Sequence, residues 1–195
     1  MYTVGMTFKT SKTLQGDGPI TIVRDEHGVP LVTAEFDTDL YRGLGYCHGA
    51  DRALQLVMVK TLAEGRACEL LADNDEMLAI DIFFRRMDFG RDAGSEFQKL
   101  PEQARMLVTA YVDGVNRALA DSFPWELKLL GLKSARYLPI DPIILGRVIA
   151  FVNLARSQGD MERLLVEMVQ NGVSRELLDE LFPGVSAELD TYLLK

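Results

Sequence analysis

The sequence predicts an α+β fold that is mainly helical and carries one β-hairpin near its N-terminus. Two short β-rich runs, Ile20–Ile22 and Leu31–Ala34, flank a turn sequence, whereas later segments show apolar residues at helical spacing. The length of 195 residues allows one or two domains, and we expect a single domain over 1–195. A hydrophobic content of 48% is enough for a sizeable core.

The N-terminal part of the chain is predicted to hold the hairpin after a polar segment. Residues 1–18 are polar and end in the loop sequence Gln15-Gly-Asp-Gly18. Asp25-Glu-His-Gly28 is typical of a hairpin turn, since Gly28 can adopt a positive φ. Because two strands alone make a marginal sheet, either the hairpin is a minor addition or another chain completes the sheet.

Two helices are expected after the hairpin. The first runs from about Leu40 to Leu71, with a break near Gly43–Gly45. A short helix is expected within 73–92. The apolar residues predicted to be buried there are Met77, Leu78, Ile80, Phe83 and Phe84.

A third helix begins at Pro101, a residue favoured at the first helical position. Gly114 lies in its middle, at a cost of about 1 kcal/mol relative to alanine. A glycine at such a position usually lets another backbone approach closely. We expect Ser122-Phe-Pro-Trp125 to end this helix.

The C-terminal part is predicted to contain one long and one short helix. Asp141 caps the long helix, which runs to about Gln170 with a kink at 157–159. Ser174 caps the short helix, and 185–195 are expected to form a flexible tail.

Charge and composition exclude several classes of partner. The net charge is −8 and no cluster of Lys and Arg overrides it, so we expect no nucleic-acid partner. No segment approaches the length of a transmembrane span, so no membrane partner is expected. The start of the sequence lacks a basic region followed by an apolar run, which predicts a cytoplasmic protein. If the sequence begins after processing, the prediction becomes a periplasmic or secreted protein.

Asp51, Arg52 and Gln55 are polar residues at helical offsets within an apolar stretch. One interpretation is a buried polar cluster that sets how two elements dock. The other is a direct catalytic role for these residues.

The usual catalytic patterns are missing from the sequence. There is no Gly-x-Ser-x-Gly elbow, and His27 and His48, the two histidines, do not lie in a Ser/His/Asp arrangement. His-Glu-x-x-His, P-loop and Gly-x-Gly-x-x-Gly patterns are also missing. We therefore expect no catalytic residue in this chain.

Five segments follow one another in an order that is found in a known family. They are Ile20-Thr-Ile-Val-Arg-Asp-Glu-His-Gly-Val-Pro30, Gly43-Leu-Gly-Tyr-Cys-His-Gly-Ala-Asp-Arg-Ala-Leu-Gln55, Glu64-Gly-Arg-Ala-Cys-Glu-Leu-Leu71, Ala110-Tyr-Val-Asp-Gly-Val-Asn116 and Tyr137-Leu-Pro-Ile-Asp141. Together they resemble the small (alpha) subunit of the penicillin acylase family. That family contains N-terminal-nucleophile amidohydrolases, among them penicillin, cephalosporin and acyl-homoserine-lactone acylases.

The resemblance implies a heterodimer. A large (beta) subunit from the same precursor would begin with Ser, Thr or Cys, and that residue would be the nucleophile. The small subunit would wrap the large one, and the two would form a four-layer αββα sandwich. Met1 cannot be this nucleophile, and no cofactor is expected for catalysis.

The resemblance also implies that the small subunit supplies one wall of the acyl-binding pocket. That wall would come from Ile149–Gln158, where Phe151, Leu154 and Ala155 are apolar. Family members that act on penicillin G carry Arg followed by a large aromatic residue, and the match here is Arg156 followed by Ser157. Ser157 would then open the pocket for longer or bulkier acyl groups. Alternatively, the apolar residues are ordinary interface core, and Arg156 pairs with a carboxylate of the partner.

A structural calcium ion at the subunit interface is a further implication of the resemblance. Glu162 is the nearest match to the small-subunit ligand, with Asp160 as the alternative. Since calcium takes six to eight oxygen ligands, one carboxylate cannot specify the site. The other interpretation of Glu162 is a solvated charge on a helix.

We therefore predict the small subunit of an amidohydrolase that cleaves an N-acyl amide, either a β-lactam side chain or an acyl-homoserine lactone. The alternative is a non-catalytic helical protein that binds a partner.

Overall fold

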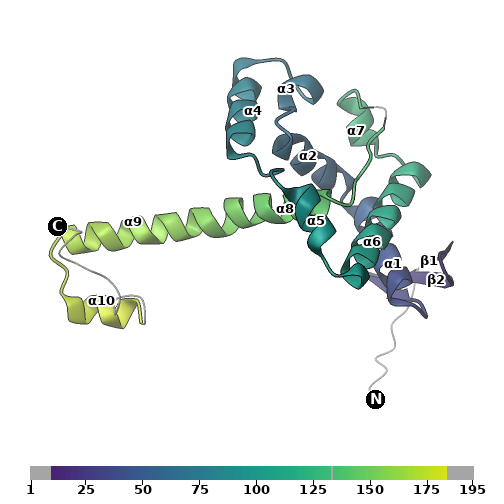
Figure 1. Ribbon diagram of the computed structural model, residues 1–195, viewed down its shortest axis with the longest axis horizontal. Helices are drawn as coiled ribbons and strands as arrows, with labels where there is room; N and C mark the ends of the chain where they lie inside the picture. Colours follow the sequence, from purple (N-terminus) through teal and green to yellow (C-terminus); the bar gives the residue numbers. More distant parts are fainter. Residues whose placement is uncertain (1–9, 133, 184–195) are drawn as a thin grey trace. The chain divides into compact units, whose positions relative to one another are not determined.

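The computed structural model describes residues 10–132 and 134–183. Its internal contacts divide the chain into two compact units, Met1–Val148 and Ile149–Lys195 (Figure 1). The single domain expected from the sequence stays a prediction, because two compact units can belong to one domain. Within the described residues, no helix combines the length and the apolar character needed to cross a membrane.

Helices dominate both units. The strands of the first unit are β1 (Thr10–Gln15), β2 (Pro19–Arg24) and β3 (Pro30–Thr33). Its helices are α1 (Asp37–Asp51), α2 (Ala53–Ala63), α3 (Ala67–Leu70), α4 (Asp75–Met87), α5 (Ala93–Lys99), α6 (Glu102–Asp121), α7 (Trp125–Leu129) and α8 (Asp141–Ile149, whose last residue lies in the second unit). The second unit contains the π-helix η1 (Ala150–Ala155), α9 (Arg156–Gln170) and α10 (Arg175–Leu181).

The sheet has three antiparallel strands in the order β1-β2-β3, one more than the predicted hairpin. β1 falls in the segment expected to be a polar loop. It was missed because Leu14 is its one buried residue, so the sequence shows no apolar alternation. The turn between β2 and β3 is confirmed, with Gly28 at a φ of 81°. The Asp25 carboxylate accepts hydrogen bonds from two backbone N–H groups of this turn.

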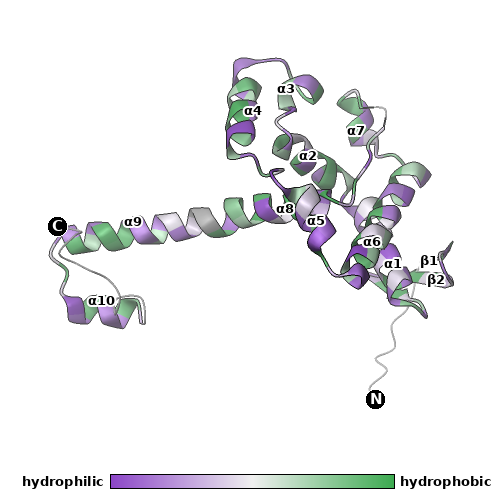
Figure 2. Ribbon diagram, viewed as in Figure 1, coloured by the Kyte–Doolittle hydropathy of each residue, from purple (hydrophilic) through white to green (hydrophobic). Residues whose placement is uncertain are grey.

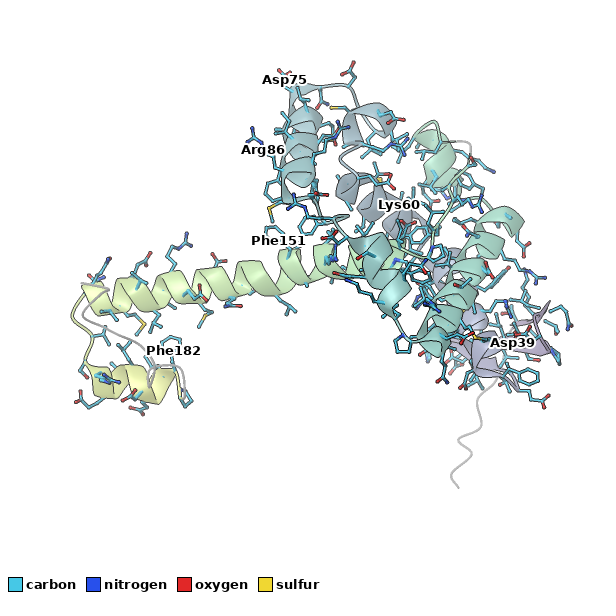
Figure 3. The ribbon with its side chains drawn as sticks, in the orientation of Figure 1. Asp39, Lys60, Asp75, Arg86, Phe151 and Phe182 are labelled. Atoms are coloured by element: carbon cyan, nitrogen blue, oxygen red, sulfur yellow. The ribbon has the colours of Figure 1, made fainter. Side chains whose placement is uncertain are left out.

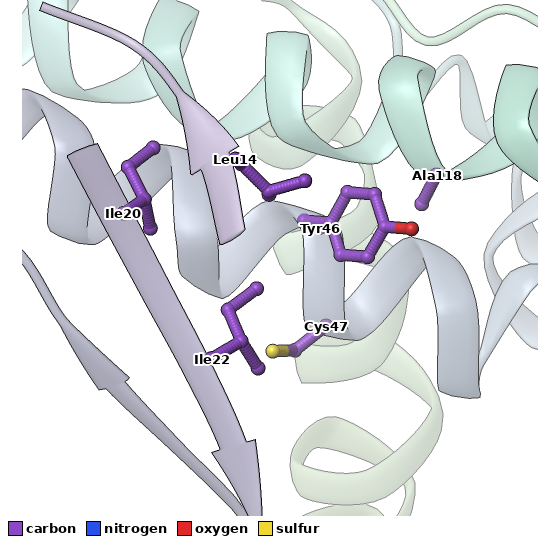
Figure 4. Close-up of a cluster of buried hydrophobic side chains, with 6 residues drawn as sticks. All are labelled: Leu14, Ile20, Ile22, Tyr46, Cys47 and Ala118. Atoms are coloured by element: carbon purple, nitrogen blue, oxygen red, sulfur yellow. The ribbon is translucent and has the colours of Figure 1, made fainter. Parts of the chain in front are cut away.

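One face of the sheet packs on α1 and α6. Leu14, Ile20 and Ile22 form one cluster with Tyr46 and Cys47 of α1. Ala118 of α6 belongs to the same cluster (Figure 4). Ile20 is fully buried, and the other members are at most 8% exposed. The apolar alternation of β2 therefore faces this core, as expected for a half-buried strand.

Helices α1 and α6 approach each other so closely that only glycine fits at their contact. A Cβ added to Gly45 would lie 1.9 Å from the Tyr111 carbonyl oxygen. A Cβ added to Gly114 would lie 2.0 Å from the Arg42 carbonyl oxygen. The close backbone approach predicted for Gly114 is thus confirmed.

The predicted helix from Leu40 to Leu71 is divided differently from the expectation. It breaks at Arg52, with φ −132° and ψ 21°, and again at Gly65, with φ 62°. No break occurs at Gly43–Gly45, which lie inside α1. These glycines serve the contact with α6 and do not interrupt the helix, so their interpretation as breakers was wrong.

Helix α4 buries one carboxylate, that of Asp81. Asp81 is 4% exposed and accepts hydrogen bonds from the N–H groups of Ala67 and Cys68, at 2.7 and 3.0 Å. The Arg85 guanidinium donates to the Gly65 carbonyl at 2.9 Å. The sequence predicted burial for five apolar residues of this segment. Leu78 and Phe83 are exposed, so the prediction is wrong for them. The other three, Met77, Ile80 and Phe84, are half-buried.

The long helix predicted from Asp141 to Gln170 contains an irregular stretch at a different place. The structure assigns a π-helix to Ala150–Ala155, whereas 157–159 lie inside α9. In the second unit, Leu165 and Val169 of α9 pack on Leu178 of α10. Ser174 caps α10 as predicted, accepting a hydrogen bond from the Leu177 N–H. The predicted tail, 185–195, lies outside the described residues.

Gly114→Ala should destabilise the fold by about 1–3 kcal/mol, because the added methyl group has no space between α1 and α6. The matched control is Gly146→Ala, since a Cβ there meets nothing within 4 Å. Alanine should stabilise α8 at that position by about 0.5–1 kcal/mol. Urea unfolding of both variants measures the difference, and equal effects would contradict the close contact.

The pH dependence of stability should report on Asp81. Burial raises the pKa of its carboxyl group, but the N–H groups of Cys68 and Ala67 outweigh burial and lower the pKa below 3.8. The ionised form therefore stabilises the fold above pH 3.8, and this contribution is lost as pH falls through the folded-state pKa. Asp81→Asn cannot titrate.

Urea unfolding from neutral pH down to about pH 2 should show that the stability of Asp81→Asn falls less steeply on acidification than that of the parent. Parallel stability profiles for the two proteins would show that the Asp81 carboxyl group has the same pKa in the folded and unfolded states.

Candidate functional site

Asp51, Arg52 and Gln55 do not form the buried cluster expected from their spacing. Asp51 accepts hydrogen bonds from the Arg24 guanidinium at 2.9 and 3.0 Å, which joins β2 to α1. Arg52 separates α1 from α2, so Gln55 belongs to a different helix, and all three residues are exposed. The docking interpretation holds for Asp51 alone, because the break removes the common helix face.

Both histidines contact neighbours with structural roles. His27 lies in the hairpin turn, and its Nε2 is 3.7 Å from a carboxylate oxygen of Glu26. His48 Nδ1 lies 3.0 Å from the Tyr111 hydroxyl, which joins α1 to α6. Within the described part of the chain, no group of three His, Cys, Asp or Glu residues is placed to hold a metal ion.

An ion pair between a half-buried lysine and a buried aspartate lies at the start of α8, and nothing in the sequence signals it. The Lys60 ammonium of α2 donates to the Asp141 carboxylate at 2.5 Å and to the Arg136 carbonyl at 3.0 Å. Asp141 is 2% exposed and also accepts from the Leu138 N–H at 2.7 Å. The two charged residues are 81 positions apart, so no local spacing signals their contact.

The loop before α8 is held by a second set of hydrogen bonds. The Asn116 side chain donates to the Tyr137 carbonyl at 2.9 Å and accepts from the Tyr137 N–H at 2.8 Å. The Tyr137 hydroxyl donates to the Leu56 carbonyl at 2.6 Å. Burial raises the pKa of this hydroxyl, so it stays protonated and remains a donor. The start of α8 is therefore fixed to both α2 and α6.

A pocket of about 390 Å³ opens beside this ion pair. Its charged lining residues are Lys60, Glu64, Arg66 and Arg136. Glu64 lies 3.6 Å from Lys60 and 3.3 Å from Arg66, and Arg66 also pairs with Glu69 at 2.7 Å. Since most of these charges already pair with one another, we interpret the lining as a structural network.

The segment expected to line an acyl pocket, Ile149–Gln158, starts at the last residue of α8 and runs through η1 into α9. A π-helix is rare, and single turns of it often occur at functional sites. The Ser157 hydroxyl donates to the Asn153 carbonyl at 2.8 Å. A serine that bonds back to the carbonyl four residues earlier weakens and bends helices, which fits an irregular stretch just before it.

The predicted pocket residues differ in exposure. Phe151 is half-buried, whereas Leu154 is 71% exposed and Ser157 is exposed. Arg156 is the first residue of α9, and its side chain lies outside the described part of the structure. Val152 of the same segment is also exposed, at 46%. An apolar, partly exposed surface thus exists where the sequence placed a pocket wall.

Glu162, the predicted calcium ligand, lies on the exposed surface of α9. Its carboxylate accepts a hydrogen bond from the Gln158 amide at 2.7 Å. The alternative ligand, Asp160, pairs with Arg163 at 3.3 Å. Glu162 has free coordination capacity for one ligand bond, and a calcium ion would need its other ligands from elsewhere.

Comparison with known proteins gives a consistent family assignment. The family model described as penicillin amidase matches residues 19–188. Penicillin acylase 2 proenzyme from Pseudomonas sp. (strain SE83) is 35% identical over 64% of this chain and 16% of the relative. Acyl-homoserine lactone acylase QuiP from Pseudomonas fluorescens (strain Pf0-1) is 26% identical over 87% of this chain and 20% of the relative.

The fold is similar to that of a solved penicillin G acylase. Thermostable penicillin G acylase from Alcaligenes faecalis matches with a TM-score of 0.62 and 23% sequence identity. The match covers 89% of this chain and 92% of that chain. By contrast, the chain spans only 16% and 20% of the two curated relatives.

The family model covers most of the chain, and the relatives found by sequence are acylases by name. The chain therefore belongs to the penicillin amidase family.

Proposed function

We propose that this chain is the small subunit of a heterodimeric acylase that hydrolyses an N-acyl amide. A difference in coverage carries this proposal. The chain corresponds to a small part of relatives named as whole enzymes, one of them a proenzyme, yet it corresponds to 92% of a chain in a solved penicillin G acylase. A precursor that is cut into one short and one long polypeptide accounts for both values.

In the proposed reaction the large subunit supplies the nucleophile. The hydroxyl or thiol of its N-terminal Ser, Thr or Cys attacks the amide carbonyl while its α-amino group takes the proton. The tetrahedral intermediate collapses, the C–N bond breaks, and the amine leaves with that proton. Water then hydrolyses the ester or thioester and releases the carboxylic acid. The present chain acts by binding and orienting the acyl group.

The wall of the acyl pocket is proposed to lie at the junction of η1 and α9. Phe151 and Leu154 present apolar surface there. The family resemblance would align Ser157, a small residue, with the aromatic residue of the members that act on penicillin G. Arg156 would anchor the segment to a carboxylate of the large subunit. The names of the relatives support two substrate classes, penicillins and acyl-homoserine lactones.

The large subunit is also proposed to complete the sheet into an αββα sandwich. β3 is an edge strand, and Leu31 on it is 51% exposed. Val29, just before β3, is 59% exposed. An exposed apolar edge strand tends to pair with other strands unless it is covered, so a partner at this edge fits the observed surface.

A calcium ion at the subunit interface remains part of the proposal. Glu162 would give one carboxylate oxygen, and the large subunit would give most of the others. The ion would hold the two chains together, and no catalytic step depends on it.

An intact-mass spectrum of the native protein, expressed from its full gene, tests the subunit proposal. We expect two polypeptides, of which the larger begins with Ser, Thr or Cys. A single polypeptide of 21.8 kDa from a complete gene would overturn the proposal and would favour a non-catalytic partner-binding protein.

Ser157→Phe tests the acyl wall. A phenyl ring should fill the space left by serine, so the preference in kcat/KM should shift toward short aromatic acyl groups by about 10–200-fold relative to long acyl chains. Ser157→Ala is the matched control, because it removes the hydrogen bond to Asn153 without adding volume. An unchanged acyl-chain profile in Ser157→Phe would place Ser157 outside the pocket.

A further inference from the structure

One cation lies within the otherwise apolar stretch formed by α8 and η1. In the sequence, Arg147 is the only charged residue between Asp141 and Arg156. The ribbon from α8 into η1 is accordingly coloured mainly as hydrophobic in Figure 2. The Arg147 side chain is 28% exposed, so its charge needs hydrogen-bond partners within the protein.

The Arg147 guanidinium holds the loop that joins α4 to α5. Its Nη1 donates to the carbonyl groups of Phe89 and Arg91, both at 2.7 Å. Its Nη2 lies 2.5 Å from a carboxylate oxygen of Glu96 on α5. A planar guanidinium offers several N–H donors in a fixed arrangement, so this one side chain binds three acceptors. A lysine could not hold all three in the same geometry.

The loop that Arg147 holds has an unfavourable backbone conformation at both ends. Asp88 has a φ of 51° and Asp92 a φ of 59°, and within the described residues these are the two non-glycine residues with a positive φ. Such conformations cost energy and persist where the surrounding structure holds them in place. The bonds from Arg147 to the loop carbonyls contribute to that hold. They also attach α8 to the loop.

Helix α8 is therefore held at two points. The Lys60–Asp141 pair holds its first residue, and Arg147 holds its last turn. The segment expected to line the acyl pocket begins at Ile149, two residues after Arg147, and η1 follows α8 without a loop. Figure 3 shows Phe151 on the ribbon that directly continues α8. The place where this segment starts is set by the last turn of α8.

We propose that Arg147 is a positioning residue for the selection of the acyl group. This inference rests on the proposed function, in which Ile149–Gln158 forms one wall of the acyl pocket. By holding the last turn of α8, Arg147 fixes the point from which the wall starts. A wall that shifts or becomes mobile discriminates less between acyl groups of different size. Arg147 takes no part in bond making, because the proposed nucleophile belongs to the other chain.

Arg147→Met in the full-length gene product tests this role, because methionine keeps an unbranched apolar side chain and removes every guanidinium donor. Arg91→Met is the matched control. It makes the same change in the loop itself, where the Arg91 side chain is 73% exposed and pairs with Asp88 at 3.0 Å. The Arg91 carbonyl, which accepts from Arg147, is unchanged in this control.

Hydrogen exchange followed by mass spectrometry measures the coupling between Arg147 and η1. The backbone amides of Ala150–Ala155 should exchange several-fold faster in Arg147→Met than in the parent, because the preceding turn has lost its hydrogen bonds to the loop. Arg91→Met should exchange at the parental rate. Equal exchange rates in the two variants would contradict the coupling.

The acyl-group profile measures the effect on selection. The probes are the p-nitroanilides of butanoic, dodecanoic and phenylacetic acid, which differ in the acyl group alone. In Arg147→Met, the ratio of kcat/KM between the best and the poorest probe should fall about tenfold. Arg91→Met should keep the parental ratio. A loss of kcat/KM by one common factor for all three probes would show that Arg147 only stabilises the fold, and would overturn the proposal.

Arg147→Lys keeps the proposal testable if the methionine variant is not produced as a folded enzyme. Its ratio should fall several-fold, since an ammonium group cannot reproduce the three contacts, and a parental ratio would overturn the role of the guanidinium. Failure of the proposed function looks different. A parent protein that stays one polypeptide and hydrolyses none of the probes would overturn that function, whereas hydrogen exchange would still report the coupling between Arg147 and η1.

Discussion

The close contact between the α1 and α6 backbones is the constraint on which the first unit depends. Gly45 and Gly114 remove the side chains that would keep these helices apart, so carbonyl groups of each helix lie against the other. One side of the helix pair then supports the sheet through Tyr46 and Cys47. Another side of α6 presents Asn116, which binds the loop at Tyr137.

This contact extends through polar groups to the start of α8. The loop at Tyr137 lies against α2 and α6, and the Lys60–Asp141 pair fixes the first residue of α8. Removing two charges from water is costly unless hydrogen bonds replace the lost solvation. Here the Arg136 carbonyl and the Leu138 N–H provide those bonds. In the sequence, α8 leads directly into η1, so a well-defined start precedes the candidate acyl-binding segment.

The division of labour proposed for the two subunits follows from what a pocket wall must do. A wall distinguishes acyl groups by shape, and a methylene group in an apolar pocket changes the transition-state energy by about 1–3 kcal/mol. In the proposal, the apolar residues Phe151 and Leu154 and the small residue Ser157 are assigned this task. The chemistry needs an activated nucleophile, which the proposal assigns to the other chain.

The sequence by itself determined the mainly helical class, the hairpin turn at Gly28, the cap at Ser174 and membership of the family. Each of these rests on local backbone preference or on a motif of neighbouring residues. Other expectations failed because they depend on partners distant in the sequence. Strand β1 is recognised only through its pairing with β2. The sequence placed the helix break at the glycines of α1, whereas the structure has it at Arg52.

Only the tertiary structure decided which polar groups are buried. In the sequence, Asp81 looks like an ordinary surface acid and Asp141 like a helix cap, yet backbone N–H groups and a lysine make their burial favourable. The π-helix at Ala150–Ala155 also had no signal in the sequence, where a kink was expected at 157–159. Burial depends on contacts between residues that are distant in the sequence, so the spacing of residues along one helix does not predict it.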